Sequence, residues 1–393
     1  NAQKTGDLYP KPSEAIEKGI ELHDEEKYKQ AILKFKLVNE NDSFYHTALY
    51  EMALSLQKDK QYELAAETAL KGLALNTEID KLFLLNYAAT LDEWGKKDSA
   101  IKVYDYGLKK YPFAHAFLHE KAIAYHKAKD WDNALKFYGE AIKLNPYSSS
   151  THWRIGIMAA CAKKPALALM ALNMYCLIVQ NQESVIRGLQ LMEKIADNEF
   201  TPDEEIDAKY FEFAKDLDEV DLIIYSKAAT QKKYKAIVKL NYDVVKQMQV
   251  LHEKLPADYK SGNWLLDFYV NFYQNVWSNG MFEGATIHSF RYVGDKDVQS
   301  KVKSKAKSID EFTAWATKRL NDLRDNKTML VDGKEVPVKL WYEDGYMRAI
   351  GVENASKQNT GPWKYYTTNY ILSAEGNFEN DKKVGTWRYY YPT

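Results

Sequence analysis

The sequence has little of three features that would each point to a particular class of protein. Its 393 residues carry a net charge of only −1 at pH 7, so there is no overall positive field to attract nucleic acid or an anionic membrane surface. Only two cysteines are present, and no uninterrupted run of about 18 apolar residues predicts a membrane span. We therefore expect no nucleic-acid partner and no membrane-spanning segment.

Familiar catalytic signatures are also missing. The sequence contains no G-x-S-x-G, no P-loop, no G-x-G-x-x-G and no H-E-x-x-H. His115 and His119 have a spacing that can hold a metal ion on a helix, but both also occupy ordinary positions of the repeat described below, and we favour that interpretation. We predict a protein that is not an enzyme and has no metal and no cofactor. The alternative is an enzyme with a deep polar pocket between the solenoid and the C-terminal domain, which would use His288 or Glu283.

What the sequence does have is a repeat of 34 residues in its N-terminal half. Ala100, Tyr104, Gly107 and Pro112 recur as Ala134, Tyr138, Ala141 and Pro146. Small residues let two helices approach closely, the aromatic ring fills the space between them, and the proline ends the second helix. The small residue that opens each second helix recurs at spacings of 34 or 35 residues, as Ala31, Ala65, Ala100, Ala134 and Ala168.

This pattern resembles the tetratricopeptide (TPR) repeat. The resemblance implies five TPR-like units over 12–182, after a flexible lead-in over 1–11. On this register Cys161 and Cys176 lie late in two antiparallel helices of one hairpin, about two turns apart, so we predict free, buried thiols.

The stretch 183–325 is expected to hold further helical pairs and an aromatic-rich helical region. One helix is predicted from Trp264 to about Ser278, and two other sequences look like helix starts. TPDE at 201–204 combines an N-cap, a proline and acidic residues. SIDE at 308–311 resembles a capping box that opens a helix to about Leu323. The lysine-rich stretch 296–307 is interpreted as a solvated linker.

A second repeat follows in 326–393. The residues GPWKYY at 361–366 recur 24 positions later as GTWRYY at 385–390, and GNFEN at 376–380 echoes GVEN at 351–354. This pattern is similar to MORN-type β-hairpin repeats, above all to the variant in antitoxin-like bacterial proteins. The resemblance implies a mainly α chain: a TPR-like α-solenoid followed by a small antiparallel β domain of MORN-like hairpins.

The resemblance to TPR arrays implies a concave groove lined by the first helix of each hairpin. If each second-helix alanine is numbered 20, the usual groove residues are those at positions 5, 9 and 12, and the polar residues at position 12, among them His23 and Gln57, line one rim. Those at positions 5 and 9 are mainly apolar and aromatic, which favours an apolar helix or extended segment of a partner protein; the alternative is that a later segment of the same chain fills the groove. The groove residues are Ile16, Ile20, Tyr50, Leu54, Leu85, His119, Ile123, Trp153 and Ile157.

A second candidate site is an aromatic face on the C-terminal sheet, which could bind a partner or a sugar. Packing of a thin sheet is the interpretation we favour for these residues, because a small sheet has little else to bury. The candidate residues are Trp341, Trp363, Tyr366, Trp387 and Tyr390.

Together these features predict a noncatalytic scaffold or adaptor whose partners are other proteins. They would bind through the concave face of the solenoid and also through the β domain. The chain begins Asn1-Ala2-Gln3 without an initiator methionine, which favours removal of a signal peptide. We therefore expect an accessory subunit of a bacterial cell-envelope assembly, periplasmic or associated with the outer membrane, with a cytoplasmic location as the alternative. The alternative function is a glycan- or peptidoglycan-binding module that uses the aromatic sheet.

Overall fold

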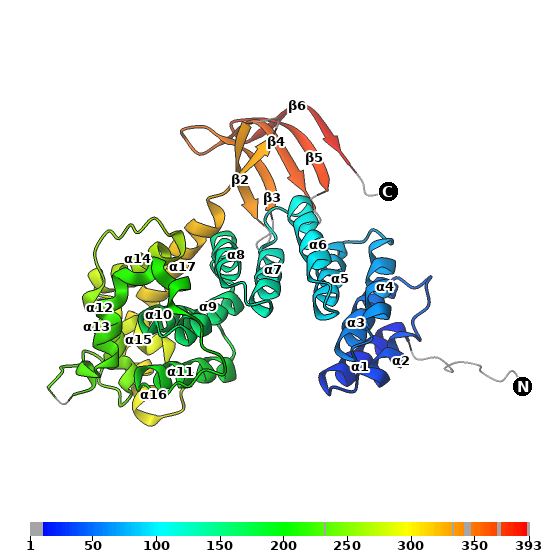
Figure 1. Cartoon of the computed structure of the whole chain (residues 1–393). Helices are drawn as coiled ribbons and strands as arrows, with labels where there is room; N and C mark the ends of the chain where they lie inside the picture. The colour runs from blue at the N-terminus through cyan, green and yellow to red at the C-terminus, as the bar shows by residue number, and fades with distance from the viewer. Residues whose placement is uncertain (1–10, 232, 332–333, 342–346, 368–370, 391–393) are drawn as a thin grey trace, which may run out of the picture. The chain divides into compact units, whose positions relative to one another are not determined.

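The computed structural model describes residues 11–231, 233–331, 334–341, 347–367 and 371–390. The chain is mainly helical and ends in an antiparallel sheet, which confirms the predicted fold class (Figure 1). The elements form two compact units, one of 1–134 with 325–393 and one of 135–324. Of the predicted lead-in, 1–10 lie outside the described residues. In the described part of the chain, no helix is both long and apolar enough to cross a membrane.

Five helical hairpins follow one another from Pro12 to Ile178. In each, the small residue that opens the second helix is fully buried, as the repeat predicts. The turn inside each hairpin contains one residue of positive φ, and these five recur at the repeat spacing as Glu26, Lys60, Gly95, Lys129 and Lys163. The helices are α1 (Pro12–Asp24), α2 (Tyr28–Phe35), α3 (Tyr45–Lys58), α4 (Tyr62–Leu73), α5 (Asp80–Glu93), α6 (Lys97–Lys110), α7 (His115–Lys127), α8 (Trp131–Leu144), α9 (Ser149–Cys161) and α10 (Pro165–Ile178).

Contacts between neighbouring helices depend on the small residues of the repeat. A Cβ added to Gly107 in α6 would lie 2.4 Å from the ring of Phe117 in α7, closer than any real side chain approaches. Phe117 is fully buried there. The absence of a side chain at Gly107 is therefore what allows the third hairpin to pack against the fourth.

In the second unit, α10 lies at the centre of the helical packing. All its residues from Pro165 to Cys176 are buried, and α9, α11, α12, α14 and α15 pack around it. The remaining elements of this unit are α11 (Gln182–Ala196), η1 (Ala208–Leu217), α12 (Asp218–Tyr225), η2 (Ala228–Thr230), α13 (Asp243–Lys254), α14 (Trp264–Ser278), α15 (Phe282–Ser289), α16 (Lys296–Ser304) and α17 (Ala306–Asp325).

The predicted helix start at Thr201 is wrong. The chain is not helical from 201 to 207, and the 3-10 helix η1 starts at Ala208 with Asp207 as its cap. The reason is a tertiary contact: the amide N–H of Ile206 donates to the carbonyl of Cys161, 3.1 Å away, at the end of α9. The side chain of Ile206 is buried as well, so this segment is held against α9 instead of entering a helix.

Two interpretations of the stretch 296–311 are also wrong. The expected linker forms α16, because Asp295 accepts hydrogen bonds from the amides of Asp297 and Val298 at 2.9 and 3.1 Å. The capping box at 308–311 does not open α17, which starts two residues earlier at Ala306; the amide of Ile309 already donates to the carbonyl of Lys305. The helix predicted from Trp264 to Ser278 is confirmed as α14.

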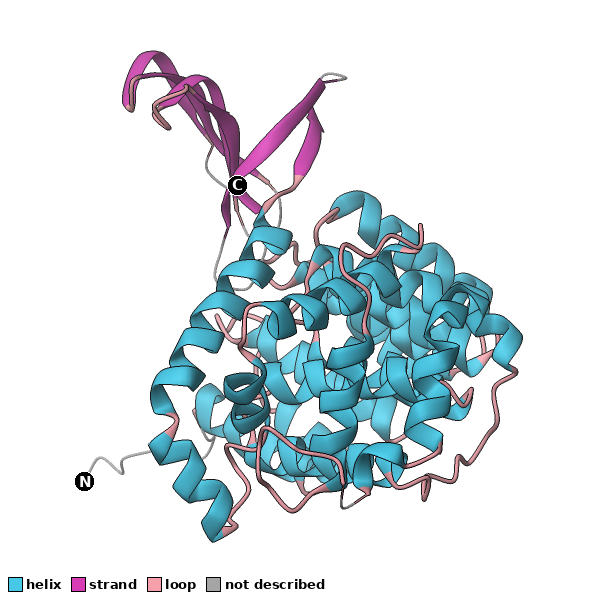
Figure 2. Cartoon of the chain, turned by 90° about the vertical axis from the view of Figure 1, so that its left-hand side faces the viewer, coloured by secondary structure: helices cyan, strands magenta, loops and turns pink. Residues whose placement is uncertain are grey.

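The C-terminal sheet is a six-stranded antiparallel meander in which each strand pairs with the next one along the chain. Figure 2 shows that the strands of the described residues gather in this sheet. Phe113, in the loop between α6 and α7, packs against Val338, Met347 and Ile350. The strands are β1 (Thr328–Val331), β2 (Lys334–Trp341), β3 (Met347–Glu353), β4 (Asn359–Tyr366), β5 (Leu372–Glu379) and β6 (Lys382–Tyr389).

The 24-residue sequence repeat forms a repeat in the structure. In the hairpin of β3 and β4, three residues of β4 (361–363) stand opposite the single Gly351, and Gly361 has φ +64°. In the hairpin of β5 and β6, residues 385–387 stand opposite Gly376 in the same way, and Gly385 also has φ +64°. Each bulge lets a tryptophan ring lie over the opposite glycine.

Candidate functional site

Each first helix of the first four hairpins carries a partly exposed apolar residue at the same repeat position. In each helix the small residue at position 8 is buried inside the hairpin, whereas the next residue, at position 9, is only partly buried. These residues therefore form a row along one side of α1, α3, α5 and α7, which belong to one compact unit. Its members are Ile20, Leu54, Ala89 and Ile123.

The predicted residues at position 5 divide into two groups. Tyr50 and Leu85 are partly exposed like the row at position 9, and the ring of Tyr50 meets Phe83 edge to face at 5.8 Å. Ile16 and His119 are buried, so the structure does not bring them to the surface with the others. Tyr50, Leu85 and the row at position 9 together form what we call the first-helix surface.

Trp153 and Ile157, the last two predicted groove residues, lie on α9 in the other compact unit. Both are partly buried. The Trp153 ring packs against Tyr175 at 5.0 Å, and the guanidinium of Arg187, on α11, lies 4.6 Å from its centroid. Trp153 is thus partly covered by later residues of its own chain.

Polar side chains join neighbouring first helices, and two of them, His23 and Gln57, are predicted groove residues at position 12. Asn86 donates to the buried side chain of Gln57 at 2.8 Å, which links α5 to α3. His23 and Ser55 hydrogen-bond at 2.8 Å and link α1 to α3. His23 and Gln57 share position 12 of the repeat, whereas their partners Ser55 and Asn86 occupy different positions and were not predicted.

One acidic group stands beside the apolar row. Glu51 follows Tyr50 on α3 and is half-buried. Burial, together with the nearby charge of Asp24, raises the pKa of the Glu51 carboxyl. A positively charged group placed against this carboxyl would offset both effects.

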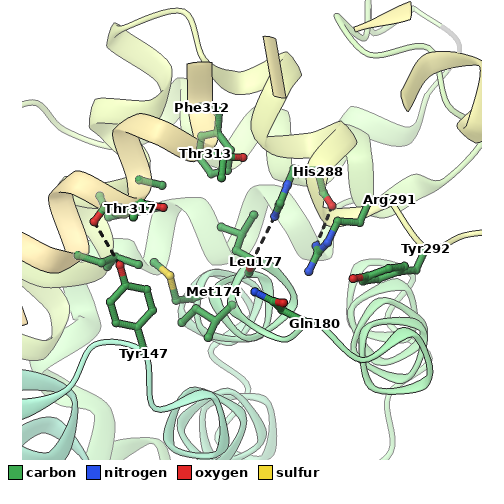
Figure 3. Close-up of a pocket in the computed structure, with 14 residues that line it drawn as sticks. Tyr147, Met174, Leu177, Gln180, His288, Arg291, Tyr292, Phe312, Thr313 and Thr317 are labelled. Carbon is green, nitrogen blue, oxygen red and sulfur yellow. Dashed lines mark hydrogen bonds between the residues drawn. The ribbon is translucent and has the colours of Figure 1, made fainter. Parts of the chain in front are cut away.

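A pocket of about 210 Å³ in the second unit contains His288, one of the residues named for the enzyme alternative (Figure 3). Its floor is apolar, with Met174, Leu177 and Phe312 among its residues. Among the described residues that line it there is no carboxylate and no cysteine. The pocket around His288 therefore combines apolar side chains with the polar side chains of Tyr147, Gln180, Arg291, Thr313 and Thr317.

Two polar side chains of this pocket, His288 and Arg291, bond to main-chain carbonyls at the end of α10. The Nε2–H of His288 donates to the carbonyl of Leu177 at 3.4 Å, and burial lowers the pKa of His288 to about 4, so the ring is neutral at pH 7. Arg291 donates to the carbonyls of Cys176 (3.0 Å) and Val179. At the C-terminus of a helix, N–H donors satisfy the free carbonyl groups, and a cation interacts favourably with the helix dipole. Glu283 is paired with Lys305 at 2.8 Å.

Burial disfavours the charged forms of both cysteines and of His115. Cys161 and Cys176 are free and buried, as predicted, and burial raises their pKa to about 11 and about 12. Burial lowers the pKa of His115 to about 4. Over the described ranges, no group of three or more His, Cys, Asp or Glu side chains is placed to hold a metal ion.

The predicted aromatic face of the sheet is not a single surface. Trp363 is 2 % exposed, and it packs with Trp387 around Phe378 at centroid distances of 5.6 and 5.1 Å. Tyr366 instead packs with Val338 in a separate cluster. The Tyr390 hydroxyl donates to Glu375 at 2.7 Å, and the side chain of Trp341 lies outside the described part of the chain.

Sequence reasoning overlooked the tyrosines that stand beside the two tryptophans. Tyr365 is 6.1 Å from both Trp363 and Trp387, and Tyr389 is 6.3 Å from Trp387. The available signal was their place two residues after each tryptophan, because alternate residues of a strand share a face.

Comparisons with known proteins identify one of the repeats. Residues 115–148, which span α7 and α8, match the family model of the tetratricopeptide repeat. A MamA structure (AMB-1) matches 42 % of this chain and 89 % of its own, with 17 % identity and a TM-score of 0.29. PilF of Pseudomonas aeruginosa matches 56 % of this chain and 97 % of its own, with 18 % identity and a TM-score of 0.36. No curated protein matches the chain.

Proposed function

We propose that this chain is a noncatalytic protein-interaction scaffold, and that it serves as an accessory subunit of a bacterial cell-envelope assembly. The observation that carries the proposal is the row of apolar residues left partly exposed on four consecutive first helices. Partly exposed apolar residues on neighbouring helices can bind a partner segment that lays its own apolar side chains along them. The neighbouring Glu51 favours a partner with a lysine or arginine beside those side chains.

Site-specific crosslinking tests whether the first-helix surface holds a partner. A photo-crosslinking amino acid at Leu54 should yield a discrete adduct with another protein in cells of the natural host. The matched control carries the same amino acid at Leu70, which is 46 % exposed on the second helix α4 of the same hairpin. Equal adducts from both positions, or none from Leu54, would contradict the proposed surface.

The envelope location is a separate part of the proposal and needs its own test. The natural full-length protein with a C-terminal epitope tag should fractionate with the periplasm or the outer membrane. It should be digested by an added protease only after the outer membrane is permeabilised. Recovery in the cytoplasmic fraction would contradict this location and would leave the crosslinking result unaffected.

The glycan-binding alternative has less support. Stacking on a sugar needs an aromatic ring whose face is accessible. Among the predicted aromatic residues, Trp363 is buried, Tyr366 packs with Val338, and Trp387 is only partly exposed. These aromatic residues are better suited to packing the sheet.

A further inference from the structure

In the interior of the sheet, the aromatic side chains of β4 are flanked by small residues on both neighbouring strands. Tyr365 pairs with Ala349 of β3 and with Ala374 of β5. Trp363 stands opposite Gly376 of β5 and lies over Gly351 of β3. The strand that follows β4 thus carries the sequence Ala-Glu-Gly at 374–376, with the alanine opposite Tyr365 and the glycine opposite Trp363.

The last strand repeats β4 but has only one neighbour. β6 carries Trp387 and Tyr389 at the positions of Trp363 and Tyr365, and it pairs with β5 alone (Figure 1). Its outer edge, within the described residues, is not paired with another strand. As a result Tyr389 is 54 % exposed and Trp387 is partly exposed, whereas Trp363 is 2 % exposed.

On the opposite face of the sheet, a row of charged residues also ends at β6. Lys364, Glu375 and Arg388 are directly paired across β4, β5 and β6, with ion-pair distances of 4.0 and 3.5 Å. The signs alternate from strand to strand, as favourable cross-strand pairs require. The row ends at Arg388, whose side chain is 72 % exposed, so a carboxylate on a further strand would continue it.

We propose that the outer edge of β6 binds an extended segment of a partner protein as a seventh antiparallel strand. The segment carries the β5 pattern: a small residue opposite Tyr389, an acidic residue opposite Arg388 and a glycine opposite Trp387. Main-chain hydrogen bonds supply affinity in such strand addition, and the alternating side chains supply specificity.

A partner chain fits this edge better than a second copy does. In each copy β5 is already paired on both sides, with β4 and β6. Two β6 strands facing each other would bring together Lys382, Lys383 and Arg388 from both copies, with no acidic residue on either strand. Like charges across a strand pair are destabilising. These lysines also discourage random edge pairing, which leaves an acidic strand as the favoured occupant.

The probe for this site is a fluorescein-labelled peptide with the β5 sequence LSAEGNFE (372–379), titrated with the full chain and followed by anisotropy. We expect saturable binding. A peptide in which Glu375 is replaced by lysine should bind the unchanged protein about threefold to tenfold more weakly. A peptide in which Gly376 is replaced by valine should bind roughly tenfold more weakly, because this residue would stand opposite Trp387 as Gly376 stands opposite Trp363 in the sheet.

Two further variants separate strand addition from nonspecific attraction. In an antiparallel pair, alternate N–H groups of a strand point to the partner strand. One peptide is N-methylated at Ala374 and Gly376, and a second peptide at Ser373 and Glu375. Only one of these two peptides should lose binding. The protein variant Arg388→Gln should remove the preference for glutamate over lysine and keep the sensitivity to Gly376→Val. No saturable binding, or equal effects of both methylation sets, would overturn the proposal. So would a dimer in light scattering that the peptide dissociates, because the occupant would then be a second copy.

Discussion

The indole N–H of Trp387 donates to the main-chain oxygen of Asn377, 3.2 Å away. Trp363 makes the same bond to Val352, also at 3.2 Å, one hairpin earlier. In both cases the acceptor directly follows the glycine under the ring. A repeated unit of the sheet is therefore a tryptophan that lies on a glycine and is fixed there by one hydrogen bond.

Replacing Gly351 by alanine should destabilise the sheet. The added Cβ would lie 2.2 Å from the ring of Trp363, which is buried and cannot move aside freely. We expect a loss of about 1–3 kcal/mol in the free energy of unfolding, measured by urea denaturation with tryptophan fluorescence. Gly294→Ala is the control, because a Cβ there meets nothing within 4 Å; an equal effect of both changes would show that ring contact is not the cause.

Ala134→Leu should overpack the fourth hairpin. Ala134 is fully buried at the position where the repeat places a small residue, and inserted methylene groups force neighbouring side chains out of their preferred positions. The expected loss is about 1–3 kcal/mol in thermal or urea unfolding. Leu33→Ala, at a residue 63 % exposed on α2, should change stability little. Full stability of Ala134→Leu would mean that the register of the repeat is wrong.

Gly95 tests the backbone geometry of the hairpin turns. It has φ +81° and no atom within 4 Å of an added Cβ, so Gly95→Ala introduces backbone strain without a clash. We expect a loss of about 1 kcal/mol. Gly294→Ala again serves as the control, because its φ lies outside the positive range where side chains are strained. If the two alanine variants unfold at the same urea concentration, the left-handed conformation at Gly95 carries no measurable strain.

His152 should make stability depend on pH. Its Nε2–H donates to the carbonyl of Pro146 at 2.9 Å, its Nδ1 accepts from the Tyr269 hydroxyl at 2.7 Å, and burial lowers its pKa from 6.5 to about 4. Below pH 6.5 the unfolded chain binds a proton that the folded chain does not, so stability contributed by His152 is complete above pH 6.5. Roughly 3 kcal/mol of it is lost as the pH falls to 4.

The variant His152→Gln isolates this contribution. Glutamine can still donate to Pro146 and accept from Tyr269, but it does not titrate. Urea unfolding at a series of pH values between 7.5 and 4 should show a smaller fall in stability for the variant than for the natural chain. Identical pH profiles would mean that other groups govern the acid sensitivity.

Leu54→Lys should weaken partner capture without unfolding the chain. Leu54 is partly exposed, so the substitution places a charge on the apolar row while the long lysine side chain reaches solvent. The yield of crosslinked partner, with the photo-crosslinking residue now at Leu85, should fall at least severalfold. Leu70→Lys should keep the full yield, and circular dichroism should show both variants folded. A full yield from Leu54→Lys would show that the row does not contact the partner.

The positions of the helical hairpins could be predicted from the sequence because their determinants are local. Ala100 and Ala134 meet side chains of neighbouring helices a few tens of residues away, and every unit repeats the same contacts. The same holds for the hairpins of the sheet, where Gly376 and Trp387 lie close in the chain. The candidate groove was predicted less well. Ile16 and His119 share repeat position 5 with Tyr50 and Leu85, but Ile16 and His119 are buried, whereas Tyr50 and Leu85 are partly exposed.

By itself the sequence determined the two periodic parts, since a period of 34 or 24 residues encodes contacts between neighbours. Only the tertiary structure decided the features that depend on distant partners. The amide of Ile206 bonds to the carbonyl of Cys161 and prevents a helix at 201–207. Arg291 and His288 satisfy the end of α10 more than 100 residues before them. Such contacts leave no periodic trace, because a hydrogen bond to a main-chain carbonyl requires no particular residue type on the accepting side.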